Sequence, residues 1–207
     1  MIETVVETCF TGGVVERVTA AAAGTRERLL AAAERLLLTE RYEAVSVRAI
    51  CVAAGVNPAA VHYHFGSKEA VVAALVEDRL GPLWADRLAE VTAAPASIAA
   101  VVDAVLAPFR ELDADPVGRL HLRLLAQVVL VQQPMAWKGR WFSMDSWTGL
   151  LPDLSASESR RRWMLAFELI IMQFGARTGD RELSTEAVAV LRDFVVAGLT
   201  APAGGAR

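Results

Sequence analysis

Several features are scarce in this 207-residue chain, and each scarcity narrows the possible functions. The two cysteines, Cys9 and Cys51, lie in unlike contexts without ligand-like spacing, so a reducing compartment is the simpler expectation. No uninterrupted apolar run reaches about 18 residues, the length needed to span a membrane. The opening MIETVVETCF carries acids where a signal peptide needs a basic region. We therefore expect a soluble, cytoplasmic protein with no membrane partner.

A strongly basic charge balance is also missing. The chain has 21 Lys and Arg against 24 Asp and Glu, for a net charge of −3. Residues 25–80 hold seven bases and seven acids, whereas a DNA-binding domain usually shows a basic footprint. A nucleic-acid function must therefore depend on where the charges are placed, not on their total.

Helix-forming residues are abundant. Apolar residues make up 54% of the chain, with Ala, Leu and Val prominent, and only two Tyr are present. This composition favours an all-α fold, which we expect to contain about nine helices. The length is enough for one or two domains with a real core.

Capping residues divide the first part of the chain into short helices. We expect residues 1–24 to be a flexible extension and Thr25 to cap the first firm helix. Ser46 can cap a helix at 47–54, and Gly55 stands where a left-handed residue ends it. Asn57 can cap the next helix, with Pro58 at its first position. Gly66 then closes that helix and Ser67 begins another, which is the layout of a helix-turn-helix at residues 25–70.

The chain stays helical after this motif, in a second domain expected at residues 71–200 before a disordered tail at 201–207. Gly81–Pro82 should kink or interrupt a long helix. Further helices are expected at 97–112 and 116–132. A capping box of Ser155 and Glu158 opens a helix to about residue 177, and Ser184 opens the last, to about residue 199.

The short helix after the turn has an unusual outer face. On a helical wheel Pro58, Val61 and Phe65 fall together and can pack inward, while Tyr63 points away from them. His62 and His64 lie on the two shoulders, where a purely structural helix would carry Lys, Glu or Gln.

This face suits a major groove, which is about 12 Å wide. Ala59 and Ala60 are slim enough to enter it, and Tyr63 with the imidazoles can hydrogen-bond phosphates or base edges. Lys68, at the start of the following helix, and Arg48, near the start of the preceding one, add cations. The alternative is a helix-turn-helix that serves only as scaffold in an all-α protein.

The stretch from Thr25 to Val72, TRERLLAAAERLLLTERYEAVSVRAICVAAGVNPAAVHYHFGSKEAVV, resembles the N-terminal domain of the TetR family of bacterial transcriptional regulators. The resemblance implies a domain that binds operator DNA as a homodimer, followed by a helical domain that binds a small ligand and dimerises. Carried over by position, the DNA-facing residues would be Ser46, Arg48, Asn57, Ala59, Ala60, His62, Tyr63, His64 and Lys68.

Two positions depart from the family pattern. His62 stands where the family usually has Tyr, which changes a common DNA contact and leaves the operator sequence open. Cys51 stands where the family has a small residue before the turn, and it still fits as a small buried group.

Residues 80–200 show no catalytic constellation, zinc-ligand grouping or phosphate-binding loop, so we expect neither an enzyme nor a cofactor. Bulky aromatics crowd into the middle of this region. They either fill a core or line an apolar pocket. In view of the resemblance, we predict a mainly apolar or aromatic small-molecule effector here. The residues predicted to contact this effector are His121, Arg123, Gln133, Trp137, Trp141, Phe142 and Trp147.

The last two helices carry wide apolar stripes that can pair with their two-fold copies as a four-helix bundle. The predicted homodimer contacts are Phe167, Ile171, Phe174, Leu191 and Val195. Glu168 interrupts the first stripe and could mark its rim, a buried hydrogen bond or a ligand contact. The run Arg160–Arg162 reads as a solvated helix face.

The sequence therefore predicts a homodimeric repressor that binds a pseudo-palindromic operator and is released by a small molecule. A transcriptional activator would share every residue named, and a ligand-binding protein with a scaffold helix-turn-helix is a further alternative.

Overall fold

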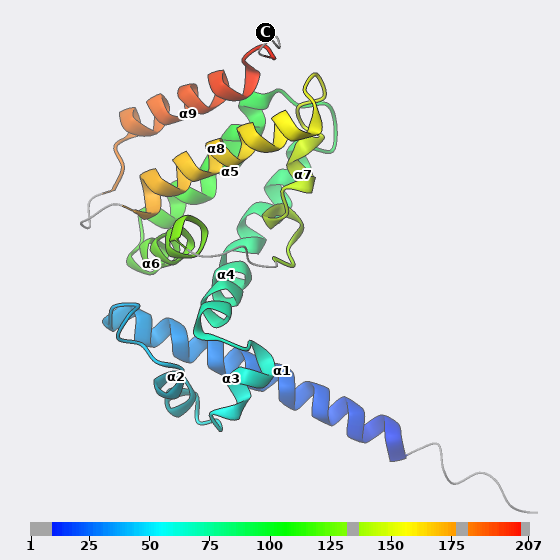
Figure 1. The fold of residues 1–207 in the computed structure, drawn as a ribbon, viewed down its shortest axis with the longest axis vertical. Coiled ribbons are helices and arrows are strands. Elements are labelled where there is room, and N and C mark those ends of the chain that lie inside the picture. Colours follow the sequence, from blue (N-terminus) through cyan, green and yellow to red (C-terminus); the bar gives the residue numbers. More distant parts are fainter. Residues whose placement is uncertain (1–9, 132–136, 177–181, 204–207) are drawn as a thin grey trace, which may run out of the picture. The chain divides into compact units, whose positions relative to one another are not determined.

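The computed structural model describes residues 10–131, 137–176 and 182–203, and all the regular elements in these ranges are helices (Figure 1). The predicted all-α fold class is confirmed. The chain divides into two compact units, the first ending at Val72 and the second beginning at Ala73. Within the described ranges, no helix is both long and apolar enough to cross a membrane.

The first unit begins with a helix that is longer than expected. Helix α1 spans Phe10–Thr39, so Thr25 lies inside it and does not cap it. The four alanines at 20–23 favour helix directly before Thr25, because alanine has the highest helix propensity and offsets the cost of Gly24. Residues 1–9 lie outside the described ranges, and a flexible extension there stays a prediction.

Three more helices complete the first unit: α2 (Val47–Ala54), α3 (Ala59–His64) and the start of α4 (Lys68–Val91). Each contributes apolar side chains that are fully removed from solvent. The buried residues include Leu29, Leu30, Ala33, Ile50, Cys51, Val61, Val71 and Val72. This small core holds the three helices of the motif in a fixed arrangement.

The second unit contains the rest of α4 and five further α-helices. These are α5 (Ile98–Asp113), α6 (Pro116–Ala126), α7 (Asp145–Thr148), α8 (Ala156–Gly175) and α9 (Thr185–Thr200). A π-helix, η1 (Gln127–Val131), continues α6, and a short 3-10 helix, η2 (Arg140–Phe142), precedes α7. Helix α6 packs on α5 and α8, and α9 packs on the same two helices.

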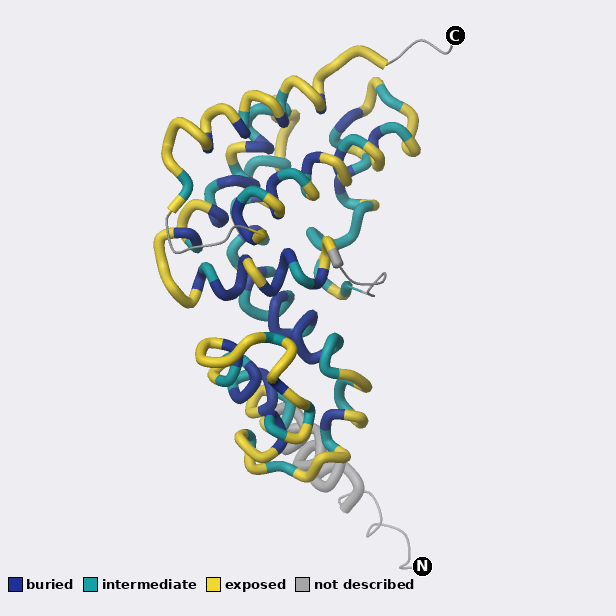
Figure 2. The backbone as a smooth tube through the Cα atoms, turned by 60° about the vertical axis from the view of Figure 1, so that its left-hand side comes forward, coloured by how far each residue is buried: buried dark blue, intermediate teal, exposed yellow. Residues whose placement is uncertain are grey.

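Figure 2 shows the consequence of this packing for exposure. In the second unit, buried residues lie along the facing sides of the helices, whereas α9 is exposed along much of its outer side. The predicted caps of α8 and α9 are confirmed, because Ser155 Oγ accepts a hydrogen bond from Glu158 N at 3.2 Å and Ser184 Oγ accepts one from Ala187 N at 3.2 Å.

Two expectations about helix continuity need correction. Helix α4 is not interrupted at Gly81–Pro82, because Leu80, Trp84 and Leu88 are buried on one side of it and hold it through the proline. The helix expected at 116–132 is α-helical only to Ala126, where the π-helix begins.

Two glycines allow close approach between elements of the second unit. A Cβ at Gly175 in α8 would lie 2.3 Å from Leu122 O and 2.7 Å from Ala126 Cβ in α6. A Cβ at Gly118 would lie 2.2 Å from Leu112 O at the end of α5. Since neither backbone neighbour can move cheaply, both positions require glycine.

Candidate nucleic-acid interface and ligand cavity

Helix α2 and the turn after it have well-defined caps. Ser46 Oγ accepts a hydrogen bond from Ala49 N at 3.1 Å, which satisfies a free amide at the start of the helix. Gly55 has a φ of 64°, and the amide of Val56 donates to Cys51 O at 3.0 Å. The left-handed Gly55 and this hydrogen bond end α2 at Ala54 and set the direction in which the chain leaves toward α3.

Helix α3 presents polar and aromatic groups to solvent. Asn57 Oδ1 accepts from Ala59 N at 2.9 Å and so begins the helix, and Val61 is fully buried beneath it. Tyr63 is 81% exposed and His62 is also exposed. An aromatic ring this exposed contributes little to the core, and its ring and hydroxyl are accessible to a partner.

One residue of α3's predicted inner face is placed differently. Pro58 is exposed and does not pack beside Val61, although its carbonyl oxygen lies 3.9 Å from the Cys51 thiol. Phe65 is half-buried, with the Arg26 guanidinium 5.7 Å from its ring centre. Val61 therefore provides the fully buried contact of the short helix, because α3 spans under two turns.

The rings at the end of α3 contact one another. Tyr63 and His64 meet edge to face with centroids 5.0 Å apart, and His64 lies 6.2 Å from Phe65. Edge-to-face contacts restrict ring rotation, so the exposed tyrosine is partly held in place before any partner arrives.

Lys68 is engaged inside the unit. Its Nζ donates to Tyr42 O at 3.0 Å and lies 4.1 Å above the Tyr42 ring, while Tyr42 OH donates to Glu69 Oε1 at 3.4 Å. The pKa of Glu69 is lowered, chiefly by the hydrogen bond from its own backbone amide. Lys68 thus ties the start of α4 to the α1–α2 connection, a role that the sequence did not indicate.

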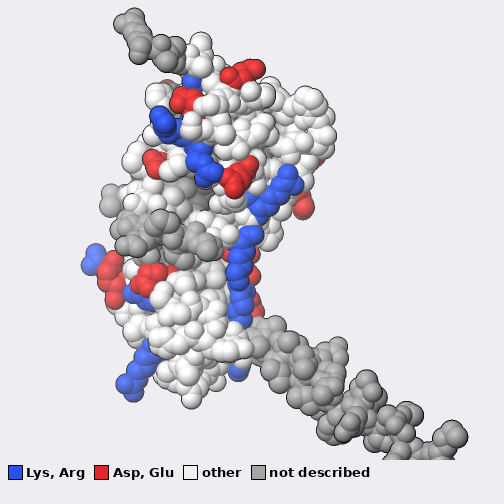
Figure 3. Space-filling view, turned by 45° about the vertical axis from the view of Figure 1, so that its right-hand side comes forward, with Lys and Arg blue, Asp and Glu red and all other residues white. Residues whose placement is uncertain are grey.

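The remaining predicted DNA-facing residues are accessible. Ser46, Arg48, Asn57 and Ala59 are exposed, and Ala60 and His64 are half-buried. Figure 3 shows Lys and Arg interspersed with Asp and Glu, with large uncharged areas between them. Both signs of charge are therefore present on the face shown.

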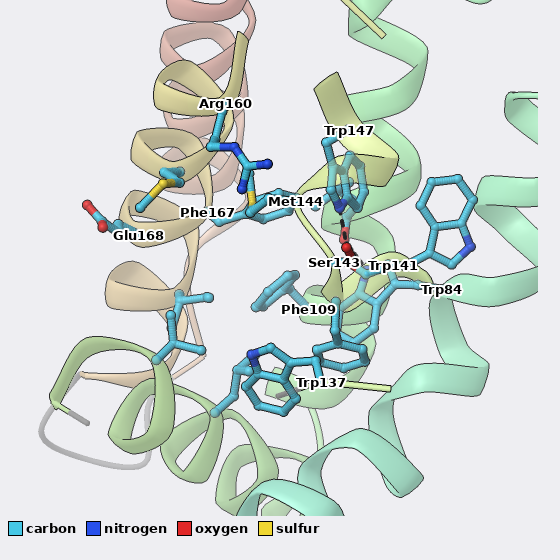
Figure 4. A pocket seen from close by; sticks show the side chains of 16 residues that line it. Trp84, Phe109, Trp137, Trp141, Ser143, Met144, Trp147, Arg160, Phe167 and Glu168 are labelled. Atoms are coloured by element: carbon cyan, nitrogen blue, oxygen red, sulfur yellow. Dashed lines mark hydrogen bonds between the residues drawn. The ribbon is translucent and has the colours of Figure 1, made fainter. Parts of the chain in front are cut away.

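The second unit contains an apolar cavity of about 630 Å³, within the usual range for small-molecule sites. Helices α4, α5, α6 and α8, with η1 and the segment 137–147, supply its walls (Figure 4). Its indoles are Trp84, Trp137, Trp141 and Trp147, and its phenyl rings are Phe109, Phe142 and Phe167. The aromatic-rich segment thus contributes to a cavity as well as to the core.

The predicted ligand contacts divide into three groups. Trp137, Trp141, Phe142 and Trp147 line the cavity, and their contact with a ligand stays a prediction. His121 is buried and Arg123 is exposed, and neither lines the cavity, because both lie on other faces of α6. Gln133 lies outside the described residues.

Several cavity residues were missed from the sequence. Trp84 and Phe109 belong to separate amphipathic helices and have no local signal that distinguishes a cavity wall from a core position. Their rings lie 5.2 Å apart, and the Trp84 indole donates to Val105 O at 2.9 Å. Only the packing of α4 on α5 brings them together.

The three arginines at the start of α8 have different environments. Arg160 lines the cavity and pairs with Asp145, which begins α7. Arg161 is exposed. Arg162 Nε donates to Glu158 at 3.0 Å, and its other nitrogens donate to carbonyls at the end of α9, including Pro202 O at 3.0 Å. The expectation of a solvated face holds for Arg161 and, in part, for Arg160, whose side chain is 50% exposed, but not for Arg162.

The predicted dimer contacts also need correction. Ile171, Phe174, Leu191 and Val195 are buried in the unit's own core, and Phe167 lines the cavity. The wide stripes of α8 and α9 face inward because each helix packs on α5 or α6. The exposed large apolar side chains of these helices are instead Met164, Leu165, Met172, Val190 and Phe194.

Comparisons with known proteins agree with this geometry. Residues 29–75 match the family described as bacterial regulatory proteins, tetR family. Among solved structures, the TetR family repressor AlkX from Dietzia sp. strain DQ12-45-1b, implicated in biodegradation of n-alkanes, matches with a TM-score of 0.50 and 16% identity. The match covers 82% of this chain and 94% of that one.

At this identity the structural likeness supports the fold alone. No curated protein matches the chain. The family match falls on α1 to α4, the same residues that form the capped helix-turn-helix, and the structural match extends over the second helical unit. Residues 29–75 therefore carry the N-terminal domain of the TetR family of bacterial regulatory proteins.

Proposed function

We propose that this protein is a ligand-responsive transcriptional repressor that binds a pseudo-palindromic operator as a homodimer. The observation that carries the proposal is the exposed face of α3, where Tyr63 and His62 project from a helix fixed by caps at both ends. Recognition helices need this combination of a rigid backbone and accessible polar side chains.

The predicted DNA-facing residues include only two cations, Arg48 and Lys68, so each one matters. Arg48 is exposed in the first turn of α2, and Lys68 is tied to Tyr42. The affinity would then come from Arg48, from hydrogen bonds by Ser46, Tyr63 and the imidazoles, and from backbone amides at helix starts. Such an interface predicts a modest salt dependence, because few counterions are released.

Dimerisation is proposed through the outer faces of α8 and α9. Leu165 and Met172 on α8, and Val190 and Phe194 on α9, are exposed, with Phe194 at 69%. Exposed apolar side chains that recur along one face of a helix suit a two-fold interface. A dimer would place two recognition helices about 34 Å apart, on successive turns of the groove.

Release by a ligand is proposed to act through α4. This helix contains Trp84 in the cavity wall, and its Glu77 Oε1 accepts hydrogen bonds from the amides of Lys138, at 2.5 Å, and Gly139. The segment carrying Trp137 is therefore attached to α4. A ligand that favours one arrangement of these groups shifts the population of α4 states, and with it the DNA-competent form.

Binding of purified protein to DNA upstream of its own gene, compared with a scrambled fragment across salt concentrations, tests the regulator assignment. The informative variant is Arg48→Gln, with Arg110→Gln as the matched control, because both arginines are exposed and Arg110 lies on α5. We expect only Arg48→Gln to weaken binding. If Arg48 contacts a phosphate, the salt slope should fall by about 1.

Equal affinity for both fragments at every salt concentration, followed by no enriched sequence in a genome-wide fragment selection, would contradict DNA reading and favour the scaffold alternative. Expression of a reporter from the bound fragment separates repressor from activator. Sedimentation of Phe194→Glu tests the interface: a shift from dimer to monomer is expected, and an unchanged dimer would place the interface elsewhere.

A further inference from the structure

The walls of the cavity favour a flat occupant. Trp137 and Phe142 stack nearly parallel, with centroids 5.0 Å apart and an interplanar angle of 24°, and Trp147 meets Phe167 edge to face at 4.7 Å. Aromatic surfaces gain from stacked and edge contacts beyond what burial alone provides. A saturated chain would gain only the burial, so the geometry favours an aromatic ring system.

The polar groups of the cavity are few and mostly occupied. The Trp84 indole donates to Val105 O, and the Trp147 indole donates to Trp141 O at 3.1 Å. These indoles therefore offer their ring surfaces to a ligand and not their N–H groups.

Two charged residues line the cavity, Arg160 and Glu168, both on α8. In Figure 4 the guanidinium of Arg160 points toward the cavity and the carboxylate of Glu168 points away from it. The charge presented to an occupant is therefore positive.

The present partner of Arg160 is weakly held. Arg160 pairs with Asp145, and their side chains are 50% and 79% exposed. Exposed ion pairs contribute little to stability because water screens them and both side chains lose freedom. Exchange of Asp145 for a ligand oxyanion therefore costs little, while arginine can bind a carboxylate through two parallel hydrogen bonds.

We propose that the effector is a flat aromatic acid, with its rings against the Trp137–Phe142 wall and its carboxylate or phenolate on Arg160 in place of Asp145. Figure 4 shows Arg160 and Trp137 on opposite sides of the cavity, so the two groups recognise opposite ends of one molecule. This inference rests on the proposed function, in which the cavity is the effector site.

Three probes test separately whether the cavity recognises aromatic rings and whether it recognises an anionic group. Anthracene-2-carboxylate carries rings and charge, its methyl ester carries the rings alone, and hexadecanoate carries the charge on a saturated chain. Calorimetric titration of the full chain, with tryptophan fluorescence as a second readout, measures each affinity. We expect the acid to bind about tenfold more tightly than either comparison probe, a difference of about 1.4 kcal/mol for each.

Variants then assign the anion subsite. Arg160→Gln should weaken binding of the acid to the level of the ester and leave the ester unchanged. Asp145→Asn should strengthen binding of the acid, because it removes the competing carboxylate. Arg161→Gln, the exposed neighbouring arginine, is the matched control and should change none of the affinities. Thermal melts of all variants report whether they remain folded.

Each contrary result overturns a specific part of the effector proposal. Equal binding of acid and ester, or an unchanged acid affinity in both Arg160→Gln and Asp145→Asn, removes the anion subsite. Tightest binding of hexadecanoate removes the aromatic class, and no binding of any probe removes the proposal. DNA binding without ligand is measured separately, so failure here leaves the regulator assignment standing, whereas ligand binding without operator binding would overturn that assignment alone.

Discussion

The two units use aromatic side chains in opposite ways. In the first, Tyr63 projects into solvent from a six-residue helix, whereas in the second, Trp163 is 1% exposed and the neighbouring rings enclose a cavity. The first unit therefore presents one aromatic ring on its outer surface, whereas the second gathers its rings around a core and a cavity. Ring composition alone does not reveal function; the placement of the rings relative to the core does.

The largest expected effect on stability is at Trp163, in the unit that buries its aromatic rings. Trp163→Ala should lower the free energy of unfolding by about 3–5 kcal/mol, because it leaves a large cavity among packed rings. Thermal or urea denaturation measures the change. Trp163→Phe is the matched variant and should cost much less, since it keeps a ring and removes an indole N–H that has no hydrogen-bond partner among the described residues. Equal losses would argue against tight packing here.

Gly175→Ala is expected to destabilise the second unit by about 1–3 kcal/mol, because the new methyl group meets Leu122 O of α6. Chemical denaturation monitored by tryptophan fluorescence measures this loss, since all five tryptophans lie in the second unit. Gly149→Ala is the control, as a Cβ there has open space. A Gly175→Ala protein as stable as the control would show that α6 and α8 can separate at little cost.

Tyr63→Ala should affect DNA binding and not stability, in contrast to Trp163→Ala, because it removes an exposed ring. The unfolding free energy should change by less than about 0.5 kcal/mol, while operator affinity falls about tenfold, or about 1.4 kcal/mol. Leu38→Ala, which removes an exposed apolar side chain from α1, is the control for DNA binding. Undiminished operator binding by Tyr63→Ala would remove the central residue from the proposed interface.

The smallest expected effect concerns the attachment of α9. Arg192 donates to both carboxylate oxygens of Asp103 in α5, at 2.6 and 2.9 Å, and these bonds hold the pKa of Asp103 below its ordinary value of 3.8. A lowered pKa in the folded state stabilises the protein above pH 3.8 and loses this effect as the pH falls through the lower value.

Asp103→Asn should therefore lower Tm slightly at pH 7, and the difference from wild type should vanish as the solution is acidified below pH 3.8. Thermal melts across pH test this, with the exposed Asp86→Asn as control. A Tm difference that stays constant with pH would show that the change acts through packing and not through the ion pair.

Local chemistry made much of the first unit predictable. Ser46, Gly55 and Asn57 act on amides within three residues of themselves, so their effect on helix ends follows from sequence spacing. The same holds for Ser155 and Ser184 in the second unit. The early start of α1 and the continuity of α4 through Pro82 were missed, because burial and propensity over many residues outweighed a single capping or breaking signal.

The candidate sites were predictable to different degrees. The outward direction of Tyr63 follows from its position relative to Val61 on one short helix. The cavity joins Trp84, Phe109 and Phe167 from three helices, and no sequence spacing relates them. The inward burial of Leu191 and Val195 likewise depended on which neighbour α9 would meet.

The sequence by itself determined the helical fold class, the capped helix-turn-helix and the family match of residues 29–75, because these depend on residues close together in the chain. Only the tertiary structure decided which apolar faces are core, which stay exposed on α8 and α9, and that Arg160 faces a cavity while Arg161 faces solvent. Those outcomes depend on the packing of distant helices, where a rotation of one residue position moves a side chain by about 100° around the helix axis.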